Sequence, residues 1–397
     1  MSKVNVIGAG FSGLIISYYL NRAGFEVALH EKEKNVGGLL LSPQTPFGLV
    51  EHAANGMLVS QELINLCKDI NTRIIYPNDR AKNKYLYVKN EKVRWPFGVV
   101  DSIFLVSQMI RFKLKKERYR PKPLETLRGW GERVFSKKLV DYLLEPAFLG
   151  VYANTANELS AQLVTGSFFK AKNKNTQKIK RQTVTFDGGM NGFCNALLSY
   201  LVSQGVNYSS ASEVKKINED ELNIVSVGLS AAQNLFKEIN SEVYTQLSRL
   251  NLLSIAKIAC FTEELDSDGF GCLFARGESV NSLGVLFDSN LFPENYKKMK
   301  LQTWIMRPEA HQQPEELKTV LQEDLHKFWG QKVNVKHMDV KVWPQTLPNY
   351  DIELEKFLTE NNTMQPIYKN TYLFANYCGD LGLSQIISRA QQLTEKL

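Results

Sequence analysis

The sequence predicts an α/β protein with a parallel sheet surrounded by helices. The first observation is an apolar strand, a glycine-rich turn, a helix and a second strand within the first 31 residues. The second is that further short apolar strands recur after residue 200 and again near residue 372. The third is size: 397 residues with 44% apolar content suffice for a large core and favour two interleaved domains.

The turn after the first strand has the glycines of a dinucleotide-binding turn. Val4–Ile7 is predicted as the strand, and the following helix ends at Gly24. The first glycine permits a tight turn, the second lets the backbone approach a pyrophosphate, and the third lets the helix pack on the strand. The helix N-terminus offers N–H groups and a positive dipole end to phosphates. This context favours a dinucleotide site over a purely structural turn, with contacts from Gly8, Gly10, Phe11, Ser12 and Gly13.

An acid follows the second predicted strand, Val27–His30. Glu31 stands where a carboxylate can accept hydrogen bonds from both ribose hydroxyls of a dinucleotide. Its negative charge would repel a 2′-phosphate, and NADP is therefore a poor candidate.

The residues after Glu31 resemble those of a known superfamily. The stretch 32–38, KEKNVGG, resembles the ExxxxxGG continuation of FAD-binding proteins of the amine oxidase and protoporphyrinogen oxidase superfamily. Residues 51–56, EHAANG, resemble the E-x-G-A segment that follows in the same group, with Ala53 in place of its glycine. The resemblance implies FAD as the cofactor. It departs at Leu39, where the family usually has an arginine shortly after the paired glycines. The implied contacts of this stretch are Lys32, Gly37, Gly38 and Leu39.

Later segments resemble protoporphyrinogen oxidases, and they occur in the order that this family has them. They are Leu144–Ala153 with Leu159-Ser160, Phe186–Met190, Leu283–Pro293, Trp343–Tyr350 and Asn376–Leu383. The resemblance implies that the backbone of Val214 contacts adenine. It also implies a turn near the flavin at Gly379, Asp380 and Leu381, where Asp380 replaces the second glycine of the family.

The resemblance implies a discontinuous, Rossmann-like FAD-binding domain formed by residues 1–64, 182–232 and 344–397. Residues 65–181 and 233–343 would form an inserted α+β substrate domain, with an antiparallel sheet and a helical cap. The family usually has a longer helical insertion where this chain has its lysine-rich stretch 170–181, so the substrate domain is expected to be trimmed.

Apolar periodicity and breaker residues predict the other elements in order. Glu145-Pro146 is expected to end the helix 135–144, because proline lacks an N–H and clashes with the preceding turn. The stretches 95–98 and 170–181 are expected to be a bend and an exposed loop. The other predicted helices are 61–70, 99–120, one opened by Glu125, 192–202, 230–250, 314–329 and 384–396. The predicted strands are 72–76, 85–89, 205–208, 212–217, 222–227, 255–262, 333–343 and 372–375.

The helix 99–120 has two interpretations. Its first part is apolar on one face, and its last part carries Arg111, Lys113, Lys115, Lys116, Arg118 and Arg120. It is either a core-facing helix with a solvated basic end or an amphipathic helix on an anionic membrane surface. No apolar run reaches about 18 residues, so no membrane-spanning helix is expected.

Composition narrows the setting and the partners. The five cysteines are scattered without a CxxC pair, which predicts a reducing, cytoplasmic compartment and no structural zinc or other metal site. The net charge of +7 is modest for this length and does not indicate nucleic acid as a partner. Met1-Ser2-Lys3 runs directly into the first strand, so no signal peptide is expected. The oligomeric state is not indicated.

The resemblance implies an FAD-dependent oxidoreductase that acts on a small molecule. A hydride would pass from a substrate carbon to flavin N5, and oxygen or another acceptor would reoxidise the flavin. No catalytic residue is assigned; His52 is nearest in sequence to the predicted flavin segment, and a structural role is favoured for it. The alternatives are an amine oxidase-like enzyme, a non-enzymatic flavin-binding protein and a nucleotide-sugar mutase. The mutase would need cations from Arg94, Arg128, Arg276 or Arg307.

Overall fold

The computed structural model divides the chain into two compact units. Unit 1 consists of Met1–Pro77, Thr176–Leu250 and Phe357–Leu397, and unit 2 consists of Asn78–Asn175 and Asn251–Lys356. Residues 2–95, 99–114, 116–169, 179–263, 265, 268–296, 299–379 and 381–397 are described. The predicted bend at 95–98, most of the predicted loop at 170–181, Asp380, and the side chains of residues 99–105 and 109 lie outside the described residues.

Unit 1 is built on a five-stranded parallel sheet. Its strand order is β10 (Asn207–Ser209), β2 (Glu26–His30), β1 (Lys3–Ile7), β11 (Leu222–Val225) and β17 (Thr371–Leu373). In the central strand Val6 lies between Leu29 of β2 and Ile224 of β11. All three of these side chains are buried, as expected for a parallel sheet that is covered on both faces.

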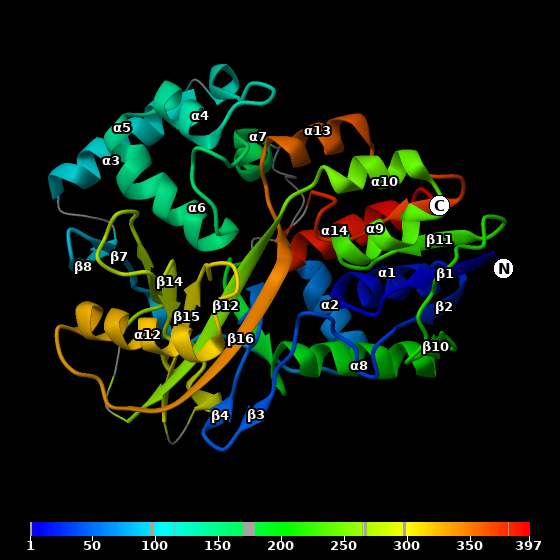
Figure 1. Ribbon diagram of the computed structural model, residues 1–397, viewed down its shortest axis with the longest axis horizontal. Coiled ribbons are helices and arrows are strands. Elements are labelled where there is room, and N and C mark those ends of the chain that lie inside the picture. Colours follow the sequence, from blue (N-terminus) through cyan, green and yellow to red (C-terminus); the bar gives the residue numbers. More distant parts are fainter. Residues whose placement is uncertain are drawn as a thin grey trace. The chain divides into compact units, whose positions relative to one another are not determined.

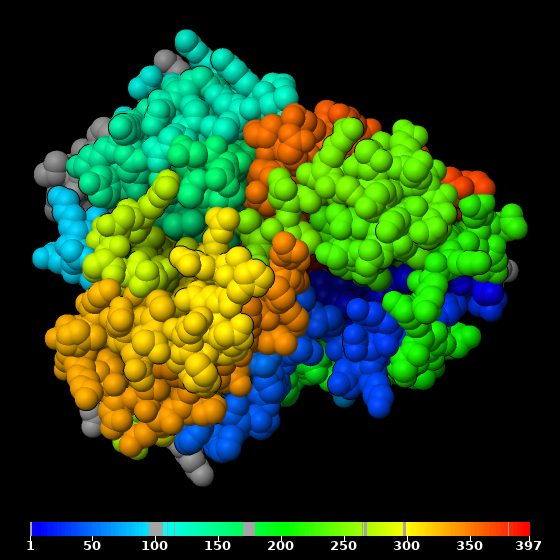
Figure 2. Space-filling model, viewed as in Figure 1, coloured from blue at the N-terminus to red at the C-terminus, as the bar shows by residue number. Residues whose placement is uncertain are grey.

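Helices and three short ribbons complete unit 1 (Figure 1). Helix α1 packs against α14 and α8, and these helices bury one continuous apolar core. In Figure 2 the three stretches of unit 1, coloured blue, green and orange to red, pack against one another. The helices are α1 (Phe11–Arg22), α2 (Gln61–Asp69), α8 (Gly189–Ser203), α9 (Leu229–Lys237), α10 (Ser241–Ser248) and α14 (Leu383–Thr394). The ribbons pair β3 (Gln44–Thr45) with β4 (Gly48–Leu49), and β9 (Thr183–Phe186) with β5 (Met57–Leu58) and β6 (Ile74–Ile75).

Unit 2 is built on a seven-stranded sheet. Its order is β16 (Val335–Pro348), β12 (Leu252–Thr262), β15 (Lys300–Met306), β14 (Gly284–Leu286), β13 (Gly271–Phe274), β7 (Lys84–Val88) and β8 (Glu91–Trp95). All neighbours are antiparallel except β13 and β7, where a strand from the first insertion joins strands from the second. The mixed α/β class with one parallel and one mainly antiparallel sheet confirms the predicted fold class.

Helix α12 (Pro314–Trp329) covers the sheet of unit 2, and its bounds are those predicted. The Gln313 and Glu316 side chains form a reciprocal capping box at its start, and Pro314 occupies the first turn. Gly330 ends the helix in the left-handed conformation, with φ +66°. The sequence signals at both ends are therefore strong and local.

The remaining helices of unit 2 are short except α3, and several of them contribute to a cluster of aromatic side chains around Phe112. They include a π-helical segment, η3, which leads directly into α6. Before residue 170 they are η1 (Asp79–Lys82), α3 (Val99–Leu114), η2 (Lys116–Tyr119), α4 (Leu127–Val134), α5 (Lys137–Leu139), η3 (Val140–Leu144), α6 (Glu145–Tyr152), α7 (Ala161–Thr165) and η4 (Gly166–Phe168). The others are α11 (Asp288–Leu291), η5 (Pro293–Asn295) and α13 (Ile352–Glu360), which spans the boundary between the units.

Three local predictions are wrong. Pro146 does not end a helix, because it lies in the first turn of α6, where a missing N–H leaves no bond unmade. Residues 212–217 form no strand; their segment instead touches the chain after β2 through Ser212 N–H and Glu31 O, at 2.8 Å. The predicted helix 230–250 is two helices, because Asn240 caps the start of α10 through Val243 N–H.

The unit boundaries differ from the predicted domain boundaries at all four junctions, most clearly at the last two. Helices α9 and α10 belong to unit 1, where the Gln233 side chain of α9 donates to Leu247 O of α10 at 3.0 Å. Residues 344–356 belong to unit 2, because β16 continues to Pro348 as the partner of β12. The division into cofactor and substrate domains remains a prediction.

Helix α3 exposes apolar side chains along one face of its second half. Val106, Ile110 and Leu114, spaced four residues apart, are 52%, 54% and 81% exposed. This half therefore does not match the core-facing interpretation. Among the described residues, no helix combines the length and the apolar character needed to cross a membrane.

Candidate functional site

The carboxyl ends of the parallel strands of unit 1 form the edge at which the candidate site lies. The chain continues from β1 to β2 on one side, and β11 on the other side is followed in the sheet by β17. The strand order therefore reverses between β1 and β11, and open parallel sheets bind ligands at such a point. Ser226, just after β11, ties this edge together. Its N–H donates to Ile7 O and its hydroxyl donates to Phe374 O, both at 2.8 Å.

The first turn, Gly8 to Gly13, accepts only glycine at two positions. Gly8 has φ +100°, and a Cβ on it would lie 2.8 Å from Ser226 O. A Cβ on Gly13 would lie 1.8 Å from Gly8 O, so helix α1 can approach strand β1 only without a side chain there. The first bond of the helix runs from Leu14 N–H to Gly10 O at 3.0 Å, and the preceding N–H groups therefore point out of its end.

A second glycine turn faces the first. Gly37 N–H donates to Ala9 O at 2.9 Å, and Gly37 and Gly38 have φ +103° and +61°. A Cβ on Gly38 would lie 3.2 Å from Gly10 Cα, and a Cβ on Gly10 would lie 3.8 Å from Gly38 Cα. We call this narrow space between Gly10 and Gly38 the glycine cradle. Within the described residues no side chain caps α1 here, so its N–H groups remain free for an anion.

Glu31 fixes the edge of the cradle. Its side chain is 8% exposed, and its two oxygens accept the N–H groups of Ala9 at 2.7 Å and Glu33 at 3.0 Å. Each carboxylate oxygen can accept a further hydrogen bond, which is what a ribose hydroxyl requires. The bond from Ser212 N–H to Glu31 O brings the segment of Val214 close to this carboxylate. Burial, followed by the charge of Glu31, raises the pKa of Tyr208 on the neighbouring strand β10.

The third turn joins β17 to α14. Gly379 has φ +103°, and Gly382 begins α14 without a capping side chain among the described residues. Leu381 is half-buried in this turn, and Asp380 lies outside the described residues. Arg389 of α14 stabilises this turn, because its guanidinium donates to Cys378 O at 2.8 Å and to Ala375 O at 3.1 Å.

Two residues that shape these turns were missed in the sequence. Asn191 of α8 donates from its side-chain nitrogen to Val36 O at 3.0 Å and to Leu40 O at 2.9 Å, and so fixes the paired-glycine turn. Its partners are about 150 residues away, and no local pattern indicates them. Arg389 had a signal: it lies three residues after Ile386 and four before Leu393, on the apolar face of its helix.

The other predicted residues of this region have structural neighbours. The Lys32 ammonium lies 3.7 Å from the Glu33 carboxylate and is largely exposed, and Leu39 is half-buried beside the paired glycines. The acid of the segment 51–56 caps a helix, because Glu51 accepts Met190 N–H at the start of α8 at 2.9 Å and receives a bond from the Ser42 hydroxyl at 2.7 Å. His52 is half-buried and donates its backbone N–H to Leu41 O at 2.9 Å; a structural role for its side chain stays a prediction.

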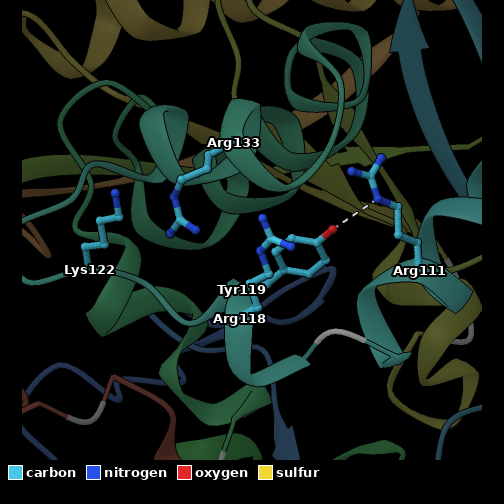
Figure 3. A pocket seen from close by; sticks show the side chains of 5 residues that line it. All are labelled: Arg111, Arg118, Tyr119, Lys122 and Arg133. Atoms are coloured by element: carbon cyan, nitrogen blue, oxygen red, sulfur yellow. Dashed lines mark hydrogen bonds between the residues drawn. The ribbon is translucent and has the colours of Figure 1, made fainter.

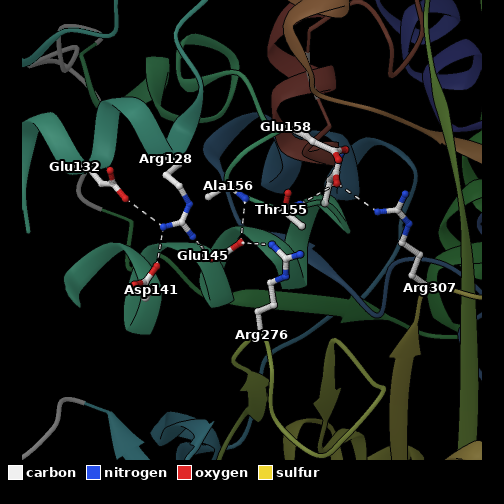
Figure 4. A network of polar contacts seen from close by, with 10 residues as sticks. Arg128, Glu132, Asp141, Glu145, Thr155, Ala156, Glu158, Arg276 and Arg307 are labelled. Atoms are coloured by element: carbon white, nitrogen blue, oxygen red, sulfur yellow. Dashed lines mark hydrogen bonds and ion pairs between the residues drawn. The ribbon is translucent and has the colours of Figure 1, made fainter. Parts of the chain in front are cut away.

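Two of the segments of unit 2 that carry the resemblance contribute residues to a polar network (Figure 4). Asn154 is fully buried; its side-chain nitrogen donates to Asn349 at 2.9 Å and to Glu158 at 2.8 Å. Its side-chain oxygen accepts from Thr155 N–H at 2.8 Å and from Arg307 at 3.3 Å. Every polar atom of this amide is thus satisfied, which fits a structural junction.

Glu145, the acid of the Glu-Pro pair, belongs to a neighbouring part of the same network. It is 3% exposed and lies 2.5 Å from Arg128, which also contacts Asp141 at 2.7 Å. Arg276 approaches the other oxygen of Glu145 at 3.9 Å (Figure 4). This carboxylate is therefore held between two guanidinium groups.

The chain matches a family of known flavoproteins. The family model described as flavin containing amine oxidoreductase matches residues 11–382, which is most of the chain. The chain belongs to this family. As a family member it is a flavin-dependent oxidoreductase that acts on a small molecule, and the resemblance to the amine oxidase superfamily is confirmed.

Similar proteins include protoporphyrinogen oxidases. This family member is 23% identical over 478 residues to protoporphyrinogen oxidase 2, chloroplastic/mitochondrial, of Arabidopsis thaliana, covering 97% of this chain and 92% of that protein. A putative protoporphyrinogen oxidase from Exiguobacterium sp. 255-15 has a similar fold, with TM-score 0.77, 16% identity, and coverage of 100% of this chain and 98% of that chain. Reduced UDP-galactopyranose mutase has a TM-score of 0.75 at 12% identity, covering 100% and 95% of the two chains. These structural similarities establish the fold alone.

Proposed function

We propose that the flavin of this enzyme is FAD and that the glycine cradle of unit 1 holds its pyrophosphate. The observation that carries the proposal is the pair of facing turns, in which Gly38 has φ +61° and a Cβ on it would lie 3.2 Å from Gly10 Cα. The free N–H groups of α1 would bind the phosphates, and Glu31 would accept bonds from the ribose hydroxyls. The segment of Val214 would lie against the adenine, and the turn at 379–381 near the flavin ring.

The substrate that we propose is a flat, largely apolar ring system of the protoporphyrinogen class. When bound, the flavin takes a hydride from a substrate carbon and gives the electrons to oxygen or another acceptor. The chain would bind the cofactor and the substrate and exclude water. The support is that the segments resembling protoporphyrinogen oxidases occur in order along the chain, and that two of them contribute Glu145 and Asn349 to the network of unit 2.

A nucleotide-sugar mutase is the second candidate, and three of the four arginines that could supply its cations already have partners. Arg128 is held by Asp141 and Glu145, at 2.7 and 2.5 Å. Arg276 lies 3.9 Å from Glu145, and Arg307 donates to Asn154 at 3.3 Å. Cations committed to buried protein groups are poor binders of a sugar pyrophosphate, so we favour the oxidase.

The cofactor proposal is tested with Gly10→Ala. A Cβ at this position meets only Gly38 Cα, at an ordinary 3.8 Å, and φ is −68°, so the fold should accept alanine. The methyl group would fill the cradle and should weaken FAD binding by at least about tenfold, or about 1.4 kcal/mol. The measurement is FAD per chain after gel filtration, with the released flavin identified by chromatography. Gly166→Ala is the control, because a Cβ there meets nothing within 4 Å.

Two results would contradict this assignment. Gly10→Ala protein that retains one FAD per chain would show that the cradle is not the pyrophosphate site. Release of a flavin other than FAD from unaltered protein would refute the choice of cofactor.

The reaction is tested by adding protoporphyrinogen to flavin-loaded protein in air, with a quinone acceptor in a parallel cuvette. We expect fluorescent protoporphyrin to form faster than in the spontaneous reaction, and Gly10→Ala protein should show only the spontaneous rate. Absence of turnover with either acceptor, from protein whose flavin is reducible by dithionite, would refute the porphyrin proposal. Interconversion of UDP-galactopyranose and UDP-galactofuranose by the reduced protein would then favour the mutase.

The cytoplasmic location and the peripheral membrane contact remain predictions. The exposed residues Val106, Ile110 and Leu114 of α3 support the second of these, because an amphipathic helix uses such a face to enter the headgroup region.

A further inference from the structure

A basic pocket lies in the helical part of unit 2. It has a volume of about 430 Å³ and is lined by Arg111, Arg118, Tyr119, Lys122 and Arg133. All five residues come from one continuous stretch: the end of α3, η2, the chain that follows, and α4. In Figure 3, Arg118 and Arg133 reach into the space from opposite sides, with Lys122 beside Arg133 and Arg111 beyond Tyr119.

The pocket has more positive charge than its acids can balance. Arg133 is paired with both oxygens of Glu125, at 2.7 and 2.6 Å. Arg111 donates from Nε to the Tyr119 hydroxyl at 3.0 Å, a neutral partner. Within the described residues, the side chains of Arg118 and Lys122 form no ion pair, and Glu117 is directed to Arg120 at 2.5 Å instead. Arg111, Arg118, Lys122 and Arg133 therefore share one cavity, where Glu125 pairs with Arg133 and also attracts Lys122. This excess of positive charge repels itself unless an anion enters.

The base of the pocket is rigid. The ring of Tyr119 stacks on Phe112 of α3, with centroids 6.2 Å apart and an interplanar angle of 13°. Phe112 also contacts Phe135 at 5.7 Å, and the buried Trp130 donates from Nε1 to Tyr119 O at 2.7 Å. The backbone from which the cations project is thus held by close packing, which reduces the entropy lost when a ligand binds.

Arginine forks with a neighbouring lysine match phosphate better than an isolated carboxylate. A guanidinium binds two phosphate oxygens at once, and a phosphate group near pH 7 carries up to two negative charges on three oxygens. We propose that this pocket binds an anion that carries phosphate groups. The proposal is independent of the flavin site, because none of the lining residues belongs to unit 1 or to the residues predicted to bind FAD.

The phosphate has two possible sources, a soluble phosphate compound and a phospholipid headgroup. The exposed face of α3, formed by Val106, Ile110 and Leu114, lies on the helix that also supplies Arg111. A lipid would contact both the face and the pocket, whereas a soluble ligand would use the pocket alone. The two sources share the same recognition chemistry and differ only in whether a bilayer is needed.

The experiment uses flavin-loaded protein, so that the nucleotide site is filled. The soluble probe is inorganic pyrophosphate, measured by titration calorimetry. The lipid probe is vesicles of phosphatidylcholine with or without phosphatidic acid, measured by cosedimentation. The variant is Arg118→Glu with Lys122→Glu, two exposed residues whose replacement should leave the fold intact. The matched control is the double variant Lys113→Glu with Lys116→Glu, which changes the charge equally but does not line the pocket.

We expect at least a tenfold loss of binding in the pocket variant and less than a twofold change in the control. Loss seen with pyrophosphate indicates a soluble ligand, and loss seen only with phosphatidic acid vesicles indicates a headgroup. Glu125→Gln should strengthen binding severalfold, because it releases Arg133 from its carboxylate. Equal losses in the pocket and control variants, or no binding of either probe by unaltered protein, would overturn the proposal.

Discussion

Arg389 is a buried cation that donates hydrogen bonds to the backbone of the third turn. It is 5% exposed, donates to the carbonyl oxygens of Ala375 and Cys378, and lies 4.5 Å from the ring centroid of Phe374. Its bonds connect helix α14 to the turn that leads to Gly379. Arg389 is therefore a positioning residue for the third turn of the candidate site.

Arg389→Met should destabilise the protein and weaken flavin binding together. The change leaves two buried carbonyl oxygens without these donors, which costs about 1–3 kcal/mol for each unsatisfied group. Urea unfolding and flavin occupancy are the measurements. Gln391→Ala, an exposed change on the same helix, should alter the free energy of unfolding by less than about 0.5 kcal/mol. An unchanged unfolding midpoint in Arg389→Met would contradict this role.

At this scale, the glycines of the first turn could be predicted, while the side chains that hold the turns could not. Gly8 and Gly13 have a local reason, because strand and helix meet within a few residues. Asn191 acts on carbonyl groups of residues 36 and 40, and such distant partners leave no periodic trace in the sequence. The one available signal, a cation on the apolar face of α14, was not used.

Arg128 of α4 contacts two unequal acids, one in α6 and one in its own helix. Arg128 of α4 contacts Glu145, which is 3% exposed, and Glu132, which is 42% exposed and 3.3 Å away. The buried pair excludes water, whereas the other is screened. The same guanidinium therefore provides an internal comparison between a buried and an exposed ion pair.

Glu145→Ala should cost much more stability than Glu132→Ala. Loss of the buried acid removes the buried partner of Arg128 and of Arg276, and should lower the free energy of unfolding by about 3 kcal/mol. Loss of the exposed acid should lower it by about 0–1 kcal/mol. Both values come from urea unfolding at neutral pH and low salt. Similar values for the two variants would show that Glu145 is not a structural acid and would reopen a catalytic role for it.

Elements with signals at both ends were predicted well. Helix α12 has a proline, a capping box and a terminal glycine, and its bounds match. The region 135–152 was predicted poorly, because proline is a stop signal inside a helix but a start signal in a first turn. The π segment Val140–Leu144 before Pro146 lets one helical run follow another without a visible break.

All five cysteines are buried and unpaired with one another, in both units of the molecule. Burial raises the pKa of Cys67 to about 12, and burial together with the Glu51 charge raises that of Cys194 to about 12. Thiolate is the reactive form, so these groups are almost entirely protonated and protected at neutral pH.

Alkylation should therefore report global unfolding. We expect iodoacetamide at pH 8 to label native protein very slowly and to label all five thiols in concentrated urea, with mass spectrometry as the readout. Labelling of native flavin-loaded protein within minutes would contradict the buried placement.

For the whole molecule, the α/β class followed from physical patterns, but the assembly did not. Strand β1 pairs with β11 more than 200 residues later, and β7 of the first insertion joins β13 of the second. Hydrophobic alternation specifies that a segment is a strand and not which distant strand it will meet. The order of the two units along the chain could be predicted only through the resemblance. The observed boundaries differ from the predicted ones, for example where β16 belongs to unit 2 and α9 and α10 belong to unit 1.

The interruption of the parallel sheet of unit 1 also determines the order in which its strands are synthesised. Strand β11 is translated before residues 251–356, and its partner β17 is translated only after them. During translation, one edge of β11 therefore remains unpaired until residues 251–356 of unit 2 have been synthesised. Such edges recruit wrong partners, so this interval is when the nascent chain depends most on chaperones.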